Sequence, residues 1–103
     1  MPAVIVQYVS KPRPGSSLPT ILEHTKEAAS LFRKHGADVS VWTELVGEIG
    51  NIVFAARYDS FEAYGHAANL LASDPAVLEW RAKALKAGQS EWVRSGIVSQ
   101  LEI

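Results

Sequence analysis

The chain has 103 residues, 48% of them hydrophobic, and a formal charge of −1 from 10 basic and 11 acidic residues. This length and composition are typical of one globular domain, here residues 1–103, with its own core. The near balance of charge argues against a nucleic-acid partner, which requires a basic surface. The chain contains no cysteine, which excludes disulfides, thiolate nucleophiles and zinc–thiolate sites.

The apolar runs are far shorter than the ~20 residues that cross a bilayer. Residues 1–4 also lack the basic region with which a signal peptide begins. We therefore expect a cytoplasmic protein that has no membrane partner.

The first third of the chain predicts a strand followed by a helix. Residues 3–9 are β-branched and aromatic on both alternating faces, which is typical of a central strand covered on both sides. Residues 10–15 contain two prolines and a glycine and predict a loop. A helix follows to about His35, capped by Ser16 or Ser17 and ended by Gly36. Its expected core-facing positions are Leu18, Ile21, Leu22, Thr25, Ala29 and Phe32.

The rest of the chain predicts a hairpin, two helices and a last strand. Residues 37–46 and 52–58 are strands joined by a short glycine-containing connection, which favours an antiparallel hairpin. Asp59, with Glu62 three positions on, indicates a helix start, and helices are expected over 60–72 and 75–87. The first of these should turn Phe61, Tyr64, Ala68, Leu71 and Ala72 inward. The last strand covers about 91–101, with a bulge or bend at Gly96.

This order is β-α-β-β-α-β, which predicts the α+β class with a four-stranded antiparallel sheet and helices on one face. The other face of the sheet also reads as apolar, and small folds of this kind cover such a face with a second copy. We therefore expect a homodimer with two sheets packed face to face. Trp42, or else Val41 and Thr43, should line that contact.

A resemblance rests on residues 47–88. Gly50-Asn51 precedes an apolar strand that ends in Tyr58-Asp59-Ser60-Phe61, and Ala72-Ser73-Asp74-Pro75 and Trp80 follow. This pattern resembles the NIPSNAP family within the ferredoxin-like, dimeric α+β barrel superfamily. The resemblance implies the dimeric barrel fold. Barrels of this superfamily include cofactor-free monooxygenases, haem-degrading enzymes and isomerases, and the fold alone does not choose among them.

The three histidines do not predict a metal site. His24 and His35 are eleven residues apart on one helix, about 16 Å along its axis, which is too far to share a metal. His35 is expected in the last helical turn, in solvent and favoured by the helix dipole. His24 lies at the edge of the apolar arc and is a candidate to line a pocket. His66 should face solvent, or a partner together with Ala63 and Leu70.

Arg81 projects from the middle of the apolar arc of its helix. A charge there must be paired or reach an edge, because an unpaired buried charge is very costly. One reading is an ion pair with an acidic side chain, for which the candidates are Glu44, Glu91 and Glu102. The other reading is an anion clamp for a ligand, because arginine offers two parallel donors.

The remaining candidates are two tyrosines and an asparagine. Tyr8 and Tyr58 read mainly as core or dimer contacts, and also as lining for a cavity between sheet and helices. An asparagine at position 51 is accounted for by the turn of the hairpin alone. Its match to the family pattern makes a functional role a second interpretation. The complete candidate pocket is Tyr8, His24, Asn51, Tyr58 and Arg81.

The leading hypothesis is a homodimer that binds a small, largely apolar organic molecule between sheet and helices. No cofactor is expected, and any conversion of the molecule would proceed without one. One alternative is a non-enzymatic dimerisation module. Another is a monooxygenase-like oxidoreductase of the same superfamily. The sequence does not decide whether the protein is an enzyme.

Overall fold

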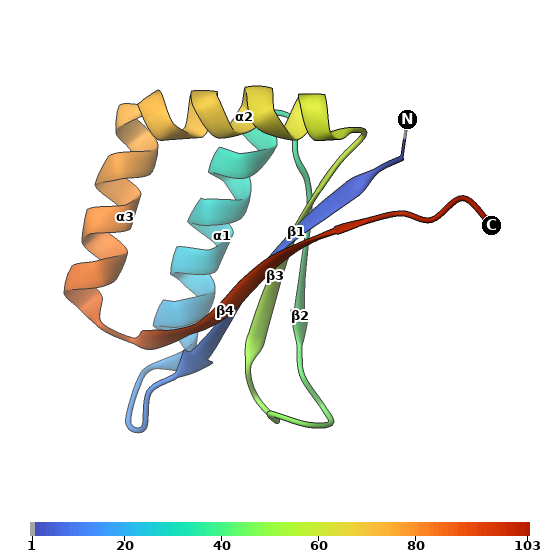
Figure 1. Cartoon of the computed structure of the whole chain (residues 1–103). Helices are drawn as coiled ribbons and strands as arrows, with labels where there is room; N and C mark the ends of the chain where they lie inside the picture. Colours follow the sequence, from blue (N-terminus) through green and yellow to red (C-terminus); the bar gives the residue numbers. More distant parts are fainter. Residues whose placement is uncertain (1) are drawn as a thin grey trace.

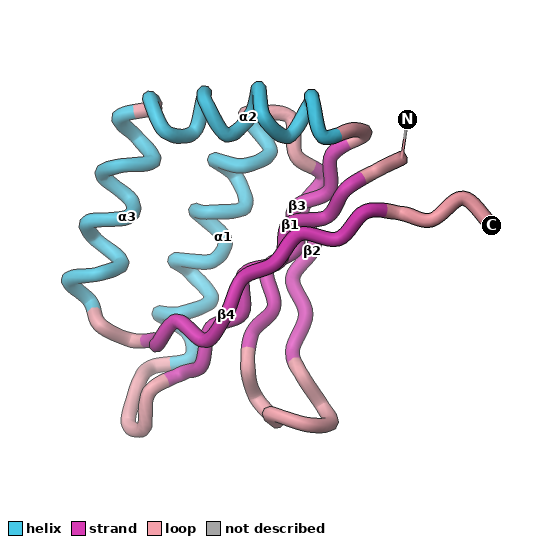
Figure 2. Tube along the Cα trace, viewed as in Figure 1, coloured by secondary structure: helices cyan, strands magenta, loops and turns pink. Residues whose placement is uncertain are grey.

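A computed structural model describes residues 2–103. Figures 1 and 2 show one antiparallel sheet with three helices on one side of it. The elements are β1 (Val4–Pro12), α1 (Leu18–Lys34), β2 (Asp38–Thr43), β3 (Ile52–Tyr58), α2 (Phe61–Ser73), α3 (Pro75–Ala87) and β4 (Ser90–Ser99).

The strand order is β2-β3-β1-β4, and every neighbouring pair is antiparallel. This arrangement confirms the predicted four-stranded sheet and the β-α-β-β-α-β order, with α2 and α3 together occupying the second helical position. Within residues 2–103, no helix combines the length and hydropathy needed to cross a membrane.

Two predicted details of the strands are wrong. β1 continues through Ser10 to Pro12 instead of ending at Val9, because β4 pairs with these extra residues. The register between β1 and β4 shifts between Val9 and Ser10 and leaves Val93 without a partner. The irregularity therefore lies at Val93, whereas Gly96 is paired regularly.

The helix side of the sheet forms the core. Along β1, Val4 and Val6 point to this side and are 0% and 6% exposed, and Tyr8 packs against the same cluster. The buried cluster also contains residues of α1, β2, β3 and α2: Ala28, Ala29, Ala37, Val39, Phe54, Ala56, Tyr58 and Ala67.

α1 is rotated relative to the predicted orientation. Ala28, which is not among the expected core-facing positions, is 5% exposed, whereas Leu18 and Leu22, expected in the core, are 53% and 47% exposed. Ala28 and Ala29 are small, so their buried positions allow the helix backbone to lie close to the sheet. The larger leucines at the start of α1 are left at the surface.

α2 is also rotated relative to the predicted orientation. Ala67 is its most buried residue, and Ala63 and Tyr64 pack against the core. Phe61 was predicted to be inward but is 55% exposed. Ala63 therefore does not belong to an outward partner surface with His66, which is exposed as expected.

Each helix has a recognisable cap at one of its ends. Ser17 caps α1, and its Oγ accepts a hydrogen bond of 3.3 Å from the Thr20 amide. α2 is capped by Ser60 instead of Asp59, whose carboxylate pairs with Arg57 at 3.1 Å. Gly88 ends α3 with a φ of 59°, a left-handed conformation that glycine adopts without strain.

Candidate functional site

Three tyrosines belong to the core between sheet and helices or pack against it. Tyr8 and Tyr58 lie on the helix side of β1 and β3, and Tyr64 comes from the second turn of α2. The ring centroids of Tyr58 and Tyr64 are 5.5 Å apart. We refer to Tyr8, Tyr58 and Tyr64 as the tyrosine cluster.

Aromatic rings surround the Tyr8 end of this cluster. The ring centroid of Tyr8 lies 5.9 Å from that of Phe32, 6.2 Å from that of Phe54 and 5.8 Å from that of Trp92. These contacts come from α1, β3 and β4, so Tyr8 is fixed by three elements. Edge and tilted arrangements of this kind are favourable for aromatic rings.

The hydroxyl groups of the cluster make no hydrogen bond within residues 2–103. Among those residues, Glu44 Oε1 is the only buried side-chain nitrogen or oxygen that lacks a hydrogen-bond partner. The three hydroxyl oxygens are therefore not sealed in the core but reach space that solvent can enter. Tyr58 is nevertheless only 3% exposed, so this space touches little beyond its hydroxyl.

Burial keeps Tyr8 and Tyr58 protonated at neutral pH. Burial raises the pKa of Tyr58 to about 12, with smaller contributions from Tyr8 and Tyr64. Burial also raises the pKa of Tyr8, and Tyr64 adds to this effect. A protonated phenol can donate a hydrogen bond to an acceptor that reaches its hydroxyl.

α3 lies beside α1 and is held there by two contacts. The indole Nε1 of Trp80 donates a 2.9 Å hydrogen bond to the carbonyl oxygen of His24. Lys83 forms an ion pair of 3.0 Å with Glu27 on the flank of α1 that faces away from the sheet. The flank of α3 opposite Lys83 takes no part in these two contacts.

This flank carries an exposed apolar surface. At 100° per residue, Leu78, Arg81 and Leu85 lie together on it, and the two leucines are 54% and 74% exposed. On the helix side of β4, Trp92 and Ile97 are 65% and 42% exposed. We refer to these five residues as the α3–β4 surface, and the contact between Tyr8 and Trp92 joins it to the tyrosine cluster.

The structure brings together part of the predicted pocket. Tyr8 and Tyr58 belong to the tyrosine cluster, and Arg81 lies on the adjoining α3–β4 surface. Arg81 is exposed and, within residues 2–103, makes none of the ion pairs predicted for it. His24 is half-buried on α1, where its backbone carbonyl binds Trp80.

Asn51 lies apart from the other predicted residues. It is 2% exposed at the start of β3, and its Nδ2 donates a 3.3 Å hydrogen bond to Glu48. Glu48 also pairs with Arg94 of β4 at 2.8 Å. Glu44 completes this cluster, since its Oε1 lies 3.5 Å from Arg94 Nη2. Asn51 therefore helps to fix the β2–β3 connection and does not reach the tyrosines.

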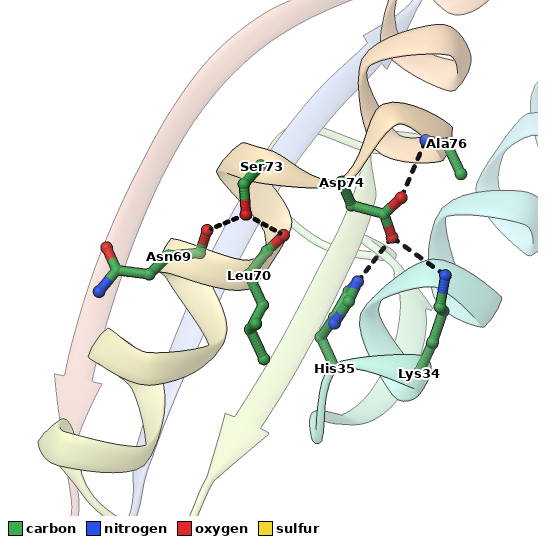
Figure 3. Close-up of polar contacts among 7 residues, drawn as sticks. All are labelled: Lys34, His35, Asn69, Leu70, Ser73, Asp74 and Ala76. Atoms are coloured by element: carbon green, nitrogen blue, oxygen red, sulfur yellow. Dashed lines mark hydrogen bonds and ion pairs between the residues drawn. The ribbon is translucent and has the colours of Figure 1, made fainter.

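Sequence reasoning missed two features of this region. Tyr64 was expected to be a core residue, because its helical spacing does not distinguish a buried ring from a site residue. His35 was expected in solvent, but its side chain is only 13% exposed and its Nε2 lies 2.7 Å from Asp74 Oδ2 (Figure 3). Lys34 Nζ lies 3.2 Å from the same oxygen, and the Ala76 amide donates to Asp74 Oδ1 at 2.9 Å.

Asp74 thus ties the end of α1 to the start of α3. The hydrogen bond from His35, then that from the Ala76 amide and the nearby Lys34, lower the pKa of Asp74 from 3.8 to about 2. A carboxylate with a lowered pKa stabilises the fold fully above its unfolded value of 3.8 and loses this effect as the pH falls to about 2.

The substitution Asp74→Asn should therefore lower the melting temperature by several degrees at pH 7 and have a much smaller effect at pH 2. Asparagine still caps helices, so the variant isolates the loss of charge. Thermal unfolding followed by circular dichroism from pH 2 to pH 7 measures the difference in melting temperature between the variant and the wild-type protein. If the melting temperatures differ by the same amount at all pH values, the charge of Asp74 does not stabilise the fold. The control is Asp59→Asn, at an exposed position.

Two open hollows lie away from the tyrosines. One of about 340 Å³ is lined by Ala3, Ile5, Arg57, Val98, Ser99 and Gln100, and one of about 380 Å³ lies between α1 and α3. In the part of the chain that the structure describes, no three histidine or acidic residues are arranged to hold a metal ion.

No family model matches the chain, and no curated protein matches it in sequence. Solved structures do match its fold. A NIPSNAP domain protein from Burkholderia xenovorans superposes with a TM-score of 0.74 at 16% identity, over 97% of this chain and 94% of that one. A NIPSNAP family protein from Agrobacterium tumefaciens gives 0.75 at 17% identity, over 96% and 87%.

This chain has the NIPSNAP fold. The resemblance predicted from residues 47–88 is thereby confirmed at the level of the fold. SnoaB from Streptomyces nogalater, a cofactor-independent oxygenase, also shares it, with a TM-score of 0.72 at 14% identity over 100% of this chain and 97% of that one. The NIPSNAP fold therefore extends to at least one protein with a described activity.

Proposed function

We propose that this protein is a NIPSNAP-like homodimer and that each subunit binds a small, largely apolar organic molecule between its sheet and its helices. The molecule would lie against the α3–β4 surface and reach the tyrosine cluster. The observation that carries this proposal is the set of three phenol hydroxyls that have no internal partner yet contact accessible space. Apolar walls with a few polar groups are typical of small-molecule sites.

The second face of the sheet supports the dimer. In the described residues 2–103 no helix covers this open face (Figure 1), and Trp42 and Val98 on it are 62% and 51% exposed. The register places Trp42 beside Val53 of β3 on this face, and places Val41 and Thr43 on the helix side. Trp42 is thus the member of the predicted set that can line a contact between sheets.

Native mass spectrometry of protein purified from its own cells tests both parts of the proposal. We expect a mass of two 11.2 kDa subunits together with a small molecule that is released on denaturation. A single subunit that carries no small molecule would overturn the proposal.

Binding should depend on the inner flank of α3. The substitution Leu85→Glu places a carboxylate on the α3–β4 surface, and burying it against an apolar ligand should weaken binding by at least about tenfold. Nitrobenzene is a suitable apolar probe, and its binding is followed by tryptophan fluorescence. The matched control is Ser30→Glu, which adds one negative charge at an exposed position on the outward side of α1. Equal effects of the two variants would place the ligand elsewhere.

Oxygenation without a cofactor is a second candidate function, favoured by the likeness to SnoaB. Its test uses the small molecule recovered from the native protein. Oxygen uptake that requires both the metal-free protein and this molecule would support the assignment. Recovery of the molecule unchanged, with no oxygen uptake, would leave binding as the function.

A further inference from the structure

The β2–β3 connection, residues 44–51, holds three large apolar side chains in solvent. Leu45, Val46 and Ile49 are 77%, 88% and 77% exposed. The backbone around them is fixed, since the Gly50 amide donates a 2.9 Å hydrogen bond to the Glu44 carbonyl oxygen. A fixed segment with exposed apolar side chains is typical of a binding contact, because it loses little further freedom when a partner covers it.

Two ion pairs hold this connection on the open face of the sheet. Arg94 lies on the open side of β4, because its register partner Val9 alternates along β1 with Tyr8 of the helix side. Arg94 pairs with Glu48 at 2.8 Å and with Glu44 at 3.5 Å. Since β2 and β4 are the outer strands, these contacts cross the open face. The 4% exposure of Val9, on a face that no helix of residues 2–103 covers, agrees with this position.

The opposite end of the open face is hollowed. Ile5 pairs with Arg57 of β3 and with Val98 of β4, so the three side chains form one row across this face. They line the hollow of about 340 Å³ described above. Ile5 precedes Val9 by four residues, which separates the hollow from the row of Arg94 by about 13 Å along β1. Figure 1 shows the β2–β3 connection and the end of β4 at opposite ends of the sheet.

The strands alone offer less surface than a stable pair of subunits needs. Four strands, of which β3 has seven residues, form a flat face of roughly 440 Å² at about 4.8 Å per strand and about 3.3 Å per residue. A specific interface typically buries about 800 Å² on each partner. A contact between two open faces must therefore extend beyond the strands, and the β2–β3 connection supplies apolar surface beside them.

Two arrangements bring the open faces of two copies together around a two-fold axis. If like ends meet, both connections occupy the same end and hold the sheets apart. If opposite ends meet, each connection lies over the hollow of the other copy, and the contact forms twice. Resting on the proposed function, we propose that opposite ends meet and that the β2–β3 connection of each copy packs into the hollow of the other. Both apolar surfaces are then removed from water.

Cross-linking between introduced cysteines tests which ends meet, because the chain has no cysteine of its own. In the full-length double variant Ile49→Cys/Val98→Cys, the short thiol reagent bismaleimidoethane should convert most of the protein to a covalent dimer. Within one copy the two positions lie at opposite ends of the face, too far apart for this reagent. Each single variant should remain separable on a denaturing gel, because neither position faces itself in the proposed arrangement.

A second measurement does not depend on a cross-link. Ile49→Asp places a charge on the β2–β3 connection and should weaken dimer association by at least about tenfold. The matched control is Leu85→Asp, because Leu85 is 74% exposed but lies on α3, away from the open face. Sedimentation velocity over a dilution series compares the two variants with the wild-type protein.

The outcomes separate this inference from the proposed dimer. If Ile49→Cys alone cross-links as completely as the double variant, like ends meet, so the inference is overturned and the dimer stands. The same conclusion follows if the wild-type protein is a dimer, the double variant does not cross-link and Ile49→Asp associates as tightly as Leu85→Asp. If the wild-type protein sediments as a single subunit at every concentration, both the inference and the proposed dimer fail.

Discussion

Phe54→Ala should lower the free energy of unfolding by about 3–5 kcal/mol, the range for a large aromatic side chain removed from a packed core. Phe54 is 8% exposed on the helix side of β3, and its ring centroid lies 5.0 Å from that of Phe32 and 6.2 Å from that of Tyr8. Domains of this size are stable by only about 5–15 kcal/mol. The loss is therefore a large share of the total.

Phe61→Ala provides the matched comparison. The chemical change is identical, but Phe61 is 55% exposed at the start of α2, so its effect should stay within about 0.5 kcal/mol. Urea unfolding of both variants at one protein concentration measures the difference. Similar losses in the two variants would show that α2 turns Phe61 inward, as its helical periodicity predicts.

Local signals explain why helix limits could be predicted from the sequence. Ser17, the Asp74-Pro75 pair and Gly88 act on residues within one turn of themselves, through capping and through restricted backbone angles. α1 and α3 therefore start and end within about two residues of their expected limits, and the β2–β3 hairpin forms where its glycines predict it.

The rotation of each helix about its axis could not be predicted in the same way. A helix with apolar residues around more than half of its circumference can bury several alternative faces. The choice in α1 depends on how closely Ala28 and Ala29 approach the sheet, a property of two elements together. The bulge at Val93 is equally non-local, since it arises from the pairing of β4 with β1.

Some residues of the candidate site could also be predicted from the sequence, whereas others could not. Tyr8 and Tyr58 could be selected from the sequence, because alternation along their strands places both on one side of the sheet. Tyr64 could not be distinguished from core residues, and the pair of His35 with Asp74 joins positions 39 residues apart. Asn51 was selected from the family resemblance, and its position in the hairpin separates it from the tyrosines.

The open face of the sheet leads to the second large expected effect. Trp42→Lys should weaken dimer association by roughly 2–4 kcal/mol, which corresponds to roughly 30- to 1,000-fold, as for a tryptophan that contributes strongly to an interface. The Trp42 ring is 62% exposed, and its Nε1 donates a 2.9 Å hydrogen bond to Ser40 Oγ. The ring is thus held by its own strand and available to a second sheet.

Trp92→Lys is a close control for this experiment. Trp92 is 65% exposed and belongs to the same sheet, but it lies on the helix side, where it contacts Tyr8. Sedimentation velocity over a dilution series should show a dimer for the wild-type protein and for Trp92→Lys, and a single subunit for Trp42→Lys. If the wild-type protein sediments as a single subunit throughout, the open face is not an interface between copies. If only Trp92→Lys dissociates, the contact lies on the helix side, and the ligand site proposed there must instead be part of the dimer.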